Sequence, residues 1–183
     1  MTVEIRFSGS GGQGILLAGE ILAEALAVYD GKNVSLCTAY GGQVRGGNSR
    51  CDVLFCEEGE EIYFPEVVDA DLLLLMTEES LNESIQNIKE GGIVIIDSSY
   101  IKGEVKSKGK VYSFPITLTV KEKLGSTMAA NIMALGMMAG ITRYVSEKAL
   151  EWALTKKIPE KMKEINLKAL QLGIILGQKM TQK

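Results

Sequence analysis

Glycines dominate the first stretch of this sequence whose residue types and spacing suit a chemical task. Gly9, Gly11 and Gly14 form a G-x-G-x-x-G pattern between the apolar run Val3–Phe7 and the helix-forming run Ile15–Ala27. Between a strand and a helix, such glycines let the backbone approach a phosphate at the positive N-terminus of the helix. We therefore expect this first glycine loop to bind an anion through the backbone of Gly9, Gly11, Gly12, Gln13 and Gly14. The plainer alternative is a tight turn with a close contact between helix and strand.

A second glycine-rich loop follows the next predicted strand, Val34–Thr38, and its candidate binding residues are Tyr40, Gly41, Arg45, Gly46 and Gly47. A guanidinium can pair with a phosphate or carboxylate through two parallel hydrogen bonds, although a single arginine on a turn is usually only a solvated charge. Both loops follow consecutive strands, so we expect them to meet at the carboxyl edge of the sheet, where α/β proteins bind ligands. The two loops are predicted to form one anion site or one interface.

A free-standing nucleotide- or flavin-dependent oxidoreductase is the alternative that the first loop alone suggests. A dinucleotide site also needs an Asp or Glu at the end of the second strand, about 20 residues on, to bind the ribose hydroxyls. Here that strand ends in Leu36-Cys37-Thr38-Ala39-Tyr40, without an acid. The sequence therefore disfavours an NAD site and leaves phosphate or another anion as the ligand.

Several kinds of catalytic chemistry are excluded by the residues that the chain lacks. It contains no histidine, so Ser-His-Asp catalysis and histidine-bound metals are ruled out. The three cysteines, Cys37, Cys51 and Cys56, form no C-x-x-C pair and no iron–sulfur or zinc spacing. We assign no catalytic residue and no metal ligand to this chain, and we expect any redox centre to lie on another chain.

The composition is typical of a globular protein of the cytoplasm. The chain has 183 residues, of which 46% are apolar and 23% charged, and its net charge is −3. This balance gives no electrostatic footprint for nucleic acid or an anionic membrane. The start has no export-signal pattern, and the most apolar stretch, 128–141, is too short to span a bilayer. We expect one domain, 1–183, without a nucleic-acid or membrane partner.

The elements that must position the two loops follow an α/β order. The apolar runs 71–76 and 92–97 are typical of strands covered on both faces, at the centre of a sheet. Other predicted elements are a strand at 50–56, a shorter one at 60–64, a small hairpin at 104–113, and helices at 126–138, at 146–156 and from Pro159 onward. We expect an α/β fold with a mainly parallel sheet, helices on both faces, a Rossmann-like βαβ start and a helical C-terminal part.

In their order, Gly9-x-Gly11-Gly12-Gln13-Gly14 and Arg45-Gly46-Gly47 make this chain similar to the gamma domain of the 2-oxoacid:ferredoxin oxidoreductases. The resemblance continues through 91–99 and 131–136, and so covers nearly the whole chain. The chain also resembles the matching domain of single-chain pyruvate oxidoreductases and the small subunit of indolepyruvate oxidoreductase. Within the family, the Gly-Ser-Gly-Gly-Gln-Gly and Arg-Gly-Gly-Asn-Ser segments look more like the 2-oxoglutarate type than the pyruvate type.

The resemblance implies a division of labour among subunits. Alpha and beta subunits would hold thiamin diphosphate and magnesium, 4Fe-4S clusters would pass electrons to ferredoxin, and coenzyme A would accept the acyl group. This chain would be the cluster-free gamma subunit, without a cofactor of its own and inactive alone, with alpha, beta and ferredoxin-like delta subunits as partners. The alternatives are a gamma subunit acting on pyruvate, branched 2-oxoacids or indolepyruvate, and a pure scaffold whose glycine loops serve only docking.

Overall fold

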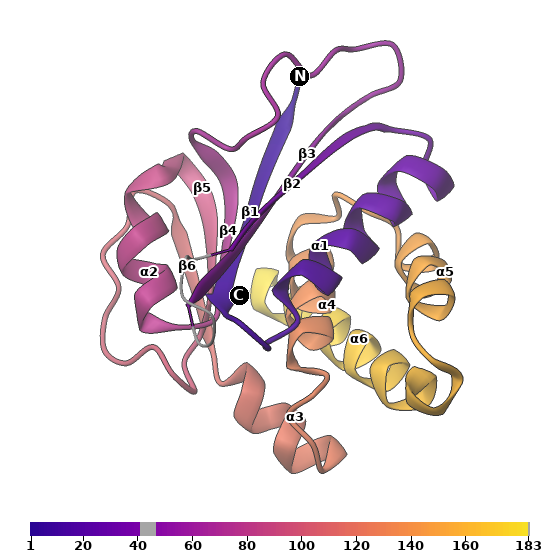
Figure 1. Ribbon diagram of the computed structural model, residues 1–183. Helices are drawn as coiled ribbons and strands as arrows, with labels where there is room; N and C mark the ends of the chain where they lie inside the picture. Colours follow the sequence, from indigo (N-terminus) through magenta and orange to yellow (C-terminus); the bar gives the residue numbers. More distant parts are fainter. Residues whose placement is uncertain (41–46, 183) are drawn as a thin grey trace.

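The computed structural model of the chain describes residues 1–40 and 47–182 (Figure 1). In this part of the chain one sheet contains the strands β1 (Val3–Ser10), β2 (Asn33–Tyr40), β3 (Asn48–Cys56), β4 (Ala70–Leu75), β5 (Ile88–Asp97) and β6 (Lys110–Phe114). The helices are α1 (Ile15–Glu24), α2 (Glu78–Ser84), α3 (Ile116–Leu124), α4 (Ala130–Thr142), α5 (Glu147–Lys157) and α6 (Glu160–Thr181). A π-helical turn, η1 (Ala25–Tyr29), extends α1, and a 3-10 turn, η2 (Ile85–Asn87), extends α2.

The sheet has the strand order β2-β3-β1-β4-β5-β6, and five of its six strands run in the same direction. The predicted mainly parallel sheet is therefore confirmed. The βαβ start differs from a βαβ unit whose two parallel strands are neighbours in the sheet. Strands β1 and β2 run in the same direction, but antiparallel β3 lies between them and pairs with both. The chain returns from β2 as a hairpin, and this return strand occupies the place beside β1.

Helices cover both faces of the sheet, as predicted (Figure 1). Leu72 and Leu74 of β4 point into a large core with α1, α4, α5 and α6, while Leu73 and Leu75 point into a smaller core that includes residues beside α2. This alternation explains the continuous apolar run of β4, because a central strand buries both of its faces. Helix α3 lies beyond the carboxyl ends of the parallel strands, at the bottom of Figure 1.

Glycines bring α4 and α6 into backbone contact. A Cβ atom on Gly136 would lie 2.3 Å from the Leu170 carbonyl oxygen, and one on Gly173 would lie 2.1 Å from the Met133 carbonyl oxygen. The same relation recurs one turn later, where Gly140 meets Ile174. Residue numbers increase in the same direction along both helices from one contact to the next, so α4 and α6 are parallel. Helix α5 connects them. This packing fixes the N-terminus of α4 at the carboxyl edge of the sheet.

Two predicted elements are wrong, and two helices escaped prediction. Residues 60–64 form no strand, and 104–113 form no hairpin, since only β6 is extended there and it pairs in parallel with β5. Helix α2 begins after Thr77, whose hydroxyl accepts the Ser80 N–H while the Ser80 hydroxyl accepts the Thr77 N–H. Such a reciprocal cap marks the N-terminus of a helix in the sequence, although no helix was predicted at this position. Helix α3, directly after Pro115, was also not predicted.

The three predicted C-terminal helices are present. Ser146 caps α5 by accepting the Ala149 N–H at 3.2 Å, and α6 follows Pro159 as expected. Helix α4 begins at Ala130, four residues later than the predicted cap at Ser126. The Ser126 hydroxyl accepts the Met128 N–H in a turn before the helix, which explains the later start.

Candidate functional site

The first glycine loop joins β1 to α1 and is closed by its own glutamine. The Gln13 side-chain oxygen accepts the Ser10 N–H at 2.8 Å, and the Gln13 N–H donates to the Ser10 carbonyl at 3.1 Å. Gly12 and Gly14 have φ angles of 91° and 73°, in the left-handed region that favours glycine. Gly9 has no room for a side chain, because a Cβ there would lie 2.5 Å from the Gln13 oxygen. These residues hold the N-terminus of α1 open toward the carboxyl edge.

Asn131, at the start of α4, lies directly against this loop. Its side-chain nitrogen donates to the Gly14 carbonyl at 2.9 Å, and a Cβ on Gly14 would lie 2.5 Å from the same nitrogen. Asn131 is 3% exposed, and its Oδ1 has no hydrogen-bond partner in the part of the chain that the structure describes. The amide therefore ties α4 to the loop and keeps one acceptor available beside it.

The described residues that flank the second glycine loop lie at the same edge as the first loop. The β2–β3 hairpin places Asn48 opposite Ser10, and the Gly11 N–H donates to the Gly47 carbonyl at 3.0 Å. The ends of the two loops are thus in direct contact. Tyr40 is the last residue of β2. The other predicted residues of this loop, Gly41, Arg45 and Gly46, lie outside the described residues.

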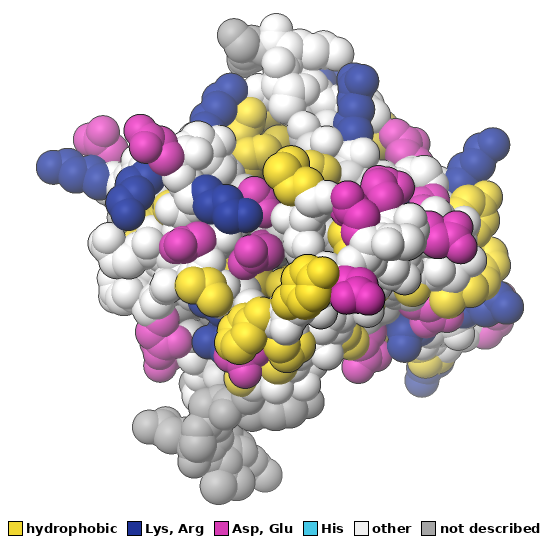
Figure 2. Space-filling model, turned by 90° about the horizontal axis from the view of Figure 1, so that it is seen from above, with side chains coloured by type: hydrophobic (Ala, Val, Ile, Leu, Met, Phe, Trp, Pro, Cys, Tyr) yellow, Lys and Arg dark blue, Asp and Glu magenta, His cyan; other side chains and the backbone are white. Residues whose placement is uncertain are grey.

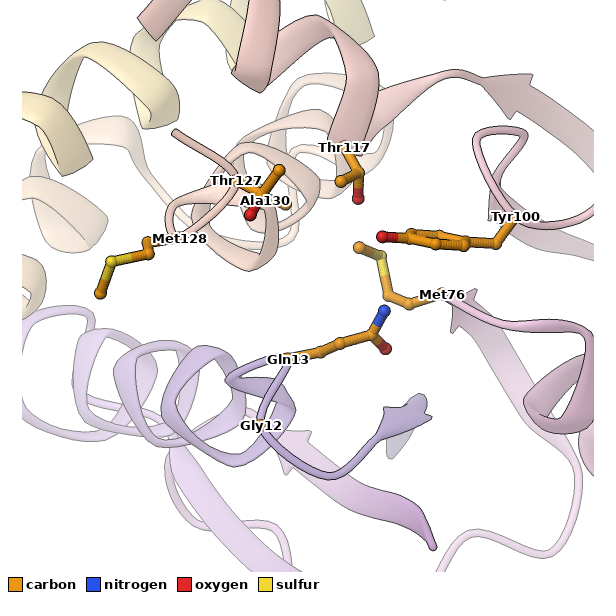
Figure 3. Close-up of a pocket in the computed structure, with 8 residues that line it drawn as sticks. All are labelled: Gly12, Gln13, Met76, Tyr100, Thr117, Thr127, Met128 and Ala130. Atoms are coloured by element: carbon orange, nitrogen blue, oxygen red, sulfur yellow. The ribbon is translucent and has the colours of Figure 1, made fainter. Parts of the chain in front are cut away.

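A pocket of about 160 Å³ opens at this edge, and Figure 3 displays the residues that line it. They come from the first loop, the ends of β4 and β5, and the starts of α3 and α4: Gly12, Gln13, Met76, Tyr100, Thr117, Thr127, Met128 and Ala130. The Gln13 amide and the Tyr100 hydroxyl point toward each other, with Met76 between them (Figure 3). Of these residues, only Gly12 and Gln13 were predicted from the sequence as site residues. The others follow strands or precede helices that are far apart in the chain.

Buried Asp97 fixes the wall of the pocket opposite the glycine loop. One of its carboxylate oxygens accepts the Ser99 N–H at 2.9 Å, and the other accepts the Thr117 N–H at 3.1 Å and the Thr117 hydroxyl at 2.5 Å. The Ser99 hydroxyl in turn accepts the Leu118 N–H at 3.0 Å. The end of β5 is therefore bound to the N-terminus of α3, and Thr117 is held in place before any ligand arrives.

The chemistry of this pocket is that of binding. Among the described residues, its lining carries amide, hydroxyl and thioether groups, without an Asp, Glu, Lys or Arg side chain. The free N–H groups at the start of α1 attract negative charge. The arrangement suits a polar or anionic part of a ligand held next to an apolar wall.

The cysteines have a structural role in this arrangement. Cys51 and Cys56 are buried, and Cys37 is half-buried. Burial, followed by the charge of Asp52, raises the pKa of the Cys51 thiol to about 12. That thiol stays protonated at neutral pH, so it is a poor nucleophile and a poor metal ligand. No group of three His, Cys, Asp or Glu side chains within residues 1–40 and 47–182 is placed to hold a metal ion.

The described helices include none with both the length and the apolar character needed to cross a membrane.

Comparison with known proteins gives consistent matches along the whole chain. Residues 4–175 match the family described as pyruvate ferredoxin/flavodoxin oxidoreductase. The 2-oxoglutarate synthase subunit KorC of Methanocaldococcus jannaschii is 35% identical over 98% of this chain and 96% of its own length.

Solved structures give the same result. The keto/oxoacid ferredoxin oxidoreductase gamma subunit of Geobacter sulfurreducens superposes with a TM-score of 0.85 and 37% identity, covering 97% of this chain and 99% of that one. The 2-oxoglutarate:ferredoxin oxidoreductase of Magnetococcus marinus, solved with 2-oxoglutarate, coenzyme A and succinyl-CoA, shares the fold at a TM-score of 0.87. At 23% identity, it covers all of this chain and 32% of its own.

Proposed function

The chain belongs to the pyruvate ferredoxin/flavodoxin oxidoreductase family, and from that premise we propose that it is the cluster-free gamma subunit of a 2-oxoglutarate:ferredoxin oxidoreductase. The observation that carries this proposal is the 35% identity with a 2-oxoglutarate synthase subunit along nearly the full length of both chains. The complex would convert 2-oxoglutarate, coenzyme A and oxidised ferredoxin to succinyl-CoA, carbon dioxide and reduced ferredoxin.

The gamma subunit contributes to this reaction without carrying its redox centres. Thiamin diphosphate and magnesium on the alpha and beta subunits supply the decarboxylation chemistry, and 4Fe-4S clusters on other subunits carry the electrons. The buried, protonated Cys51 thiol supports such an accessory place. Alpha, beta and a ferredoxin-like delta subunit are the proposed partners.

The edge with the two glycine loops is the proposed binding region of this subunit. Gly9, Gly11, Gly12, Gln13 and Gly14 let a phosphate-bearing ligand approach the start of α1, and the hydrogen bond from Gly11 to Gly47 supports a shared site with the second loop. We propose Tyr40, Gly41, Arg45, Gly46 and Gly47 as the residues of the second loop that complete it. Coenzyme A and thiamin diphosphate are the phosphate-bearing candidates for this position.

The test of the function is reconstitution. The chain, coexpressed with the alpha, beta and delta subunits, should form a complex that reduces ferredoxin only when 2-oxoglutarate and coenzyme A are both present. Pyruvate, branched 2-oxoacids and indolepyruvate should be poorer substrates at equal concentration. Failure of the chain to assemble would contradict the subunit role, and a higher kcat/KM with pyruvate would contradict the choice of substrate.

The test of the binding region is the Arg45→Ala variant in the assembled complex. Loss of a charge-assisted hydrogen bond of about 1.5–3 kcal/mol should raise the apparent KM for coenzyme A or thiamin diphosphate roughly ten- to a hundredfold. Lys148→Ala removes an equal charge from the exposed face of α5 and serves as the control. An intact Arg45→Ala complex with unchanged kinetics would leave a pure scaffold role for the loops.

A further inference from the structure

The segment between β3 and β4 exposes apolar side chains at the amino end of the parallel strands, opposite the edge with the glycine loops. Tyr63 is 89% exposed, Phe64 57% and Val68 58%, and Met1, 94% exposed, lines a surface hollow together with Tyr63. We call these four residues the amino-edge patch. Figure 2 views the molecule from this side and shows hydrophobic side chains gathered at the surface, with both acidic and basic side chains around them. Exposed apolar patches with a polar rim mark interaction sites.

A buried ion pair holds the end of this segment in place. Asp52 accepts two hydrogen bonds from the Arg6 guanidinium, each 2.8 Å long, and both side chains are almost completely buried. Val67 is attached to both, because its N–H donates to Asp52 at 3.1 Å and its carbonyl accepts from Arg6 at 2.7 Å. The backbone beside the patch is thus fixed to the sheet.

The beginning of the segment is held as well. The Glu60 carbonyl accepts the Asn33 side-chain amide at 2.7 Å, and the Cys56 thiol donates to the same carbonyl at 3.4 Å. Tyr63 and Phe64 therefore stand on a segment anchored on both sides. Their exposure is built into the fold, and a partner that buries them loses little backbone entropy on binding.

The charges around the patch define the partner. Between residues 57 and 69 the sequence has six acids and no Lys or Arg: Glu57, Glu58, Glu60, Glu61, Glu66 and Asp69. Three of the six are paired, Glu57 with Lys32, Glu60 with the N-terminal amine and Glu66 with Arg50, whereas Glu58, Glu61 and Asp69 make no ion pair within the described residues. A two-fold contact between copies would place these acids opposite one another. A partner with a basic rim would neutralise them.

We propose that the amino-edge patch docks this chain onto another subunit of the oxidoreductase complex, at an apolar pocket rimmed by lysine or arginine. The inference rests on the proposed function for the identity of the complex. Tyr63 and Phe64 are the anchors, because aromatic side chains at the centre of an interface carry much of its binding energy. Glu58 and Glu61 supply the complementary rim, which speeds association and makes it sensitive to salt.

The test compares three double variants of the full-length chain, each added to the purified remaining subunits at two salt concentrations. Tyr63→Ser/Phe64→Ser removes the anchors, and Glu58→Lys/Glu61→Lys reverses the rim. Val28→Ser/Ile175→Ser removes two exposed apolar side chains on η1 and α6 and serves as the control. Association is measured by light scattering and by the activity recovered, and the thermal midpoint of each isolated chain confirms that it is folded.

Each docking variant should weaken assembly at least tenfold, and the charge-reversed variant should lose most of the salt dependence. The control should assemble as the wild type does. Wild-type assembly by both docking variants would overturn the proposal, as would a wild-type chain that dimerises through Tyr63 and Phe64. Failure of the wild-type chain to join the other subunits at all would instead contradict the proposed function, so the two failures are distinguishable.

Discussion

The glycines of the first loop are required for different physical reasons, although they occupy equivalent places in the sequence motif. Gly12 and Gly14 both need a positive φ, but only Gly14 is also pressed against another side chain. Gly9 has ordinary dihedral angles and is required because its neighbours leave no space. The pattern G-x-G-x-x-G thus combines turn geometry with close packing, which are the two parts of the plainer interpretation, while anion binding by this loop stays a prediction.

Gly14→Ala should destabilise the isolated chain more than Gly12→Ala. Both substitutions force an alanine into the left-handed region at about 1–2 kcal/mol. At Gly14 the new methyl group also displaces the Asn131 amide and breaks its hydrogen bond, worth about 1 kcal/mol. Urea unfolding curves of the two variants measure the difference. Equal midpoints would mean that Asn131 does not support the loop.

The Cys51 thiol makes stability depend on pH in the alkaline range. Its pKa is raised from 9.0 to about 12 in the folded chain, first by burial and then by Asp52. Its contribution to stability is therefore complete below pH 9 and lost as the pH rises from 9 to about 12, because only the unfolded chain releases the proton readily. The free energy of unfolding should fall over this window, and Cys51→Ala should reduce the slope relative to the wild type. A parallel slope in the variant would assign the fall to other groups.

At the scale of elements, the sequence predicts those whose pattern is local. The runs 71–76 and 92–97 are strands, and Ser146 and Pro159 mark the starts of helices. The position of β3 between β2 and β1 was not predicted, because strand order depends on pairing between distant segments. The pocket was not predicted either, because its lining also comes from distant segments. Met76, Tyr100 and Thr117 meet only after folding, although Met76 ends one predicted strand and Tyr100 follows another.

The contact between α4 and α6 should be intolerant of any side chain at its glycines. In Gly173→Ala the methyl group would lie 2.1 Å from the Met133 carbonyl oxygen, so the helices must separate. Overpacking costs about 1–3 kcal/mol or more, which exceeds the gain of up to about 1 kcal/mol in helix propensity. Thermal unfolding should show a lower midpoint. Gly91→Ala adds its methyl group in open space but at a φ of 75°, so it measures the cost of backbone strain in the absence of a clash.

The buried pair of Arg6 and Asp52 should control how firmly the 57–69 segment is held. Asp52→Leu leaves the Arg6 guanidinium buried without a counter-charge, at a cost of about 3–5 kcal/mol. A glutamate-specific protease should then cleave the segment at Glu57–Glu61 faster under native conditions. Lys157→Ala is the control, since it removes ion pairs with Glu20 and Glu24 that lie outside the segment. Equal cleavage of both variants would exclude the pair as the anchor.

At the scale of the whole molecule, the two proposed functions belong to opposite ends of the parallel strands. The carboxyl edge carries the glycine loops and the pocket, and the amino edge carries the exposed aromatic side chains. A central sheet connects them, so a change at one end need not disturb the other. Ligand affinity and subunit affinity should therefore respond to different variants of this chain.

The isolated chain should be a colourless protein without enzymatic activity. Its three cysteines have no iron–sulfur spacing, and its buried Cys51 thiol is protonated at neutral pH, so we expect no iron–sulfur cluster on this chain. Visible absorbance, iron content and reduction of an artificial acceptor with 2-oxoglutarate should all be at background. Iron–sulfur absorbance or turnover by this chain alone would contradict its role as an accessory subunit.

The place of β3 in the sheet also sets the order in which the molecule assembles. Strands β2 and β3 are neighbours in the chain and can form their hairpin within about 1–10 μs. Pairing of β3 with β1 must instead close a loop that contains α1 and β2, and such long-range closure is slow. The hydrogen bond between Gly11 and Gly47 forms only in that second step. A chain growing on the ribosome therefore cannot complete its ligand-binding edge until β3 has emerged, and a stalled intermediate would carry a finished hairpin but no site.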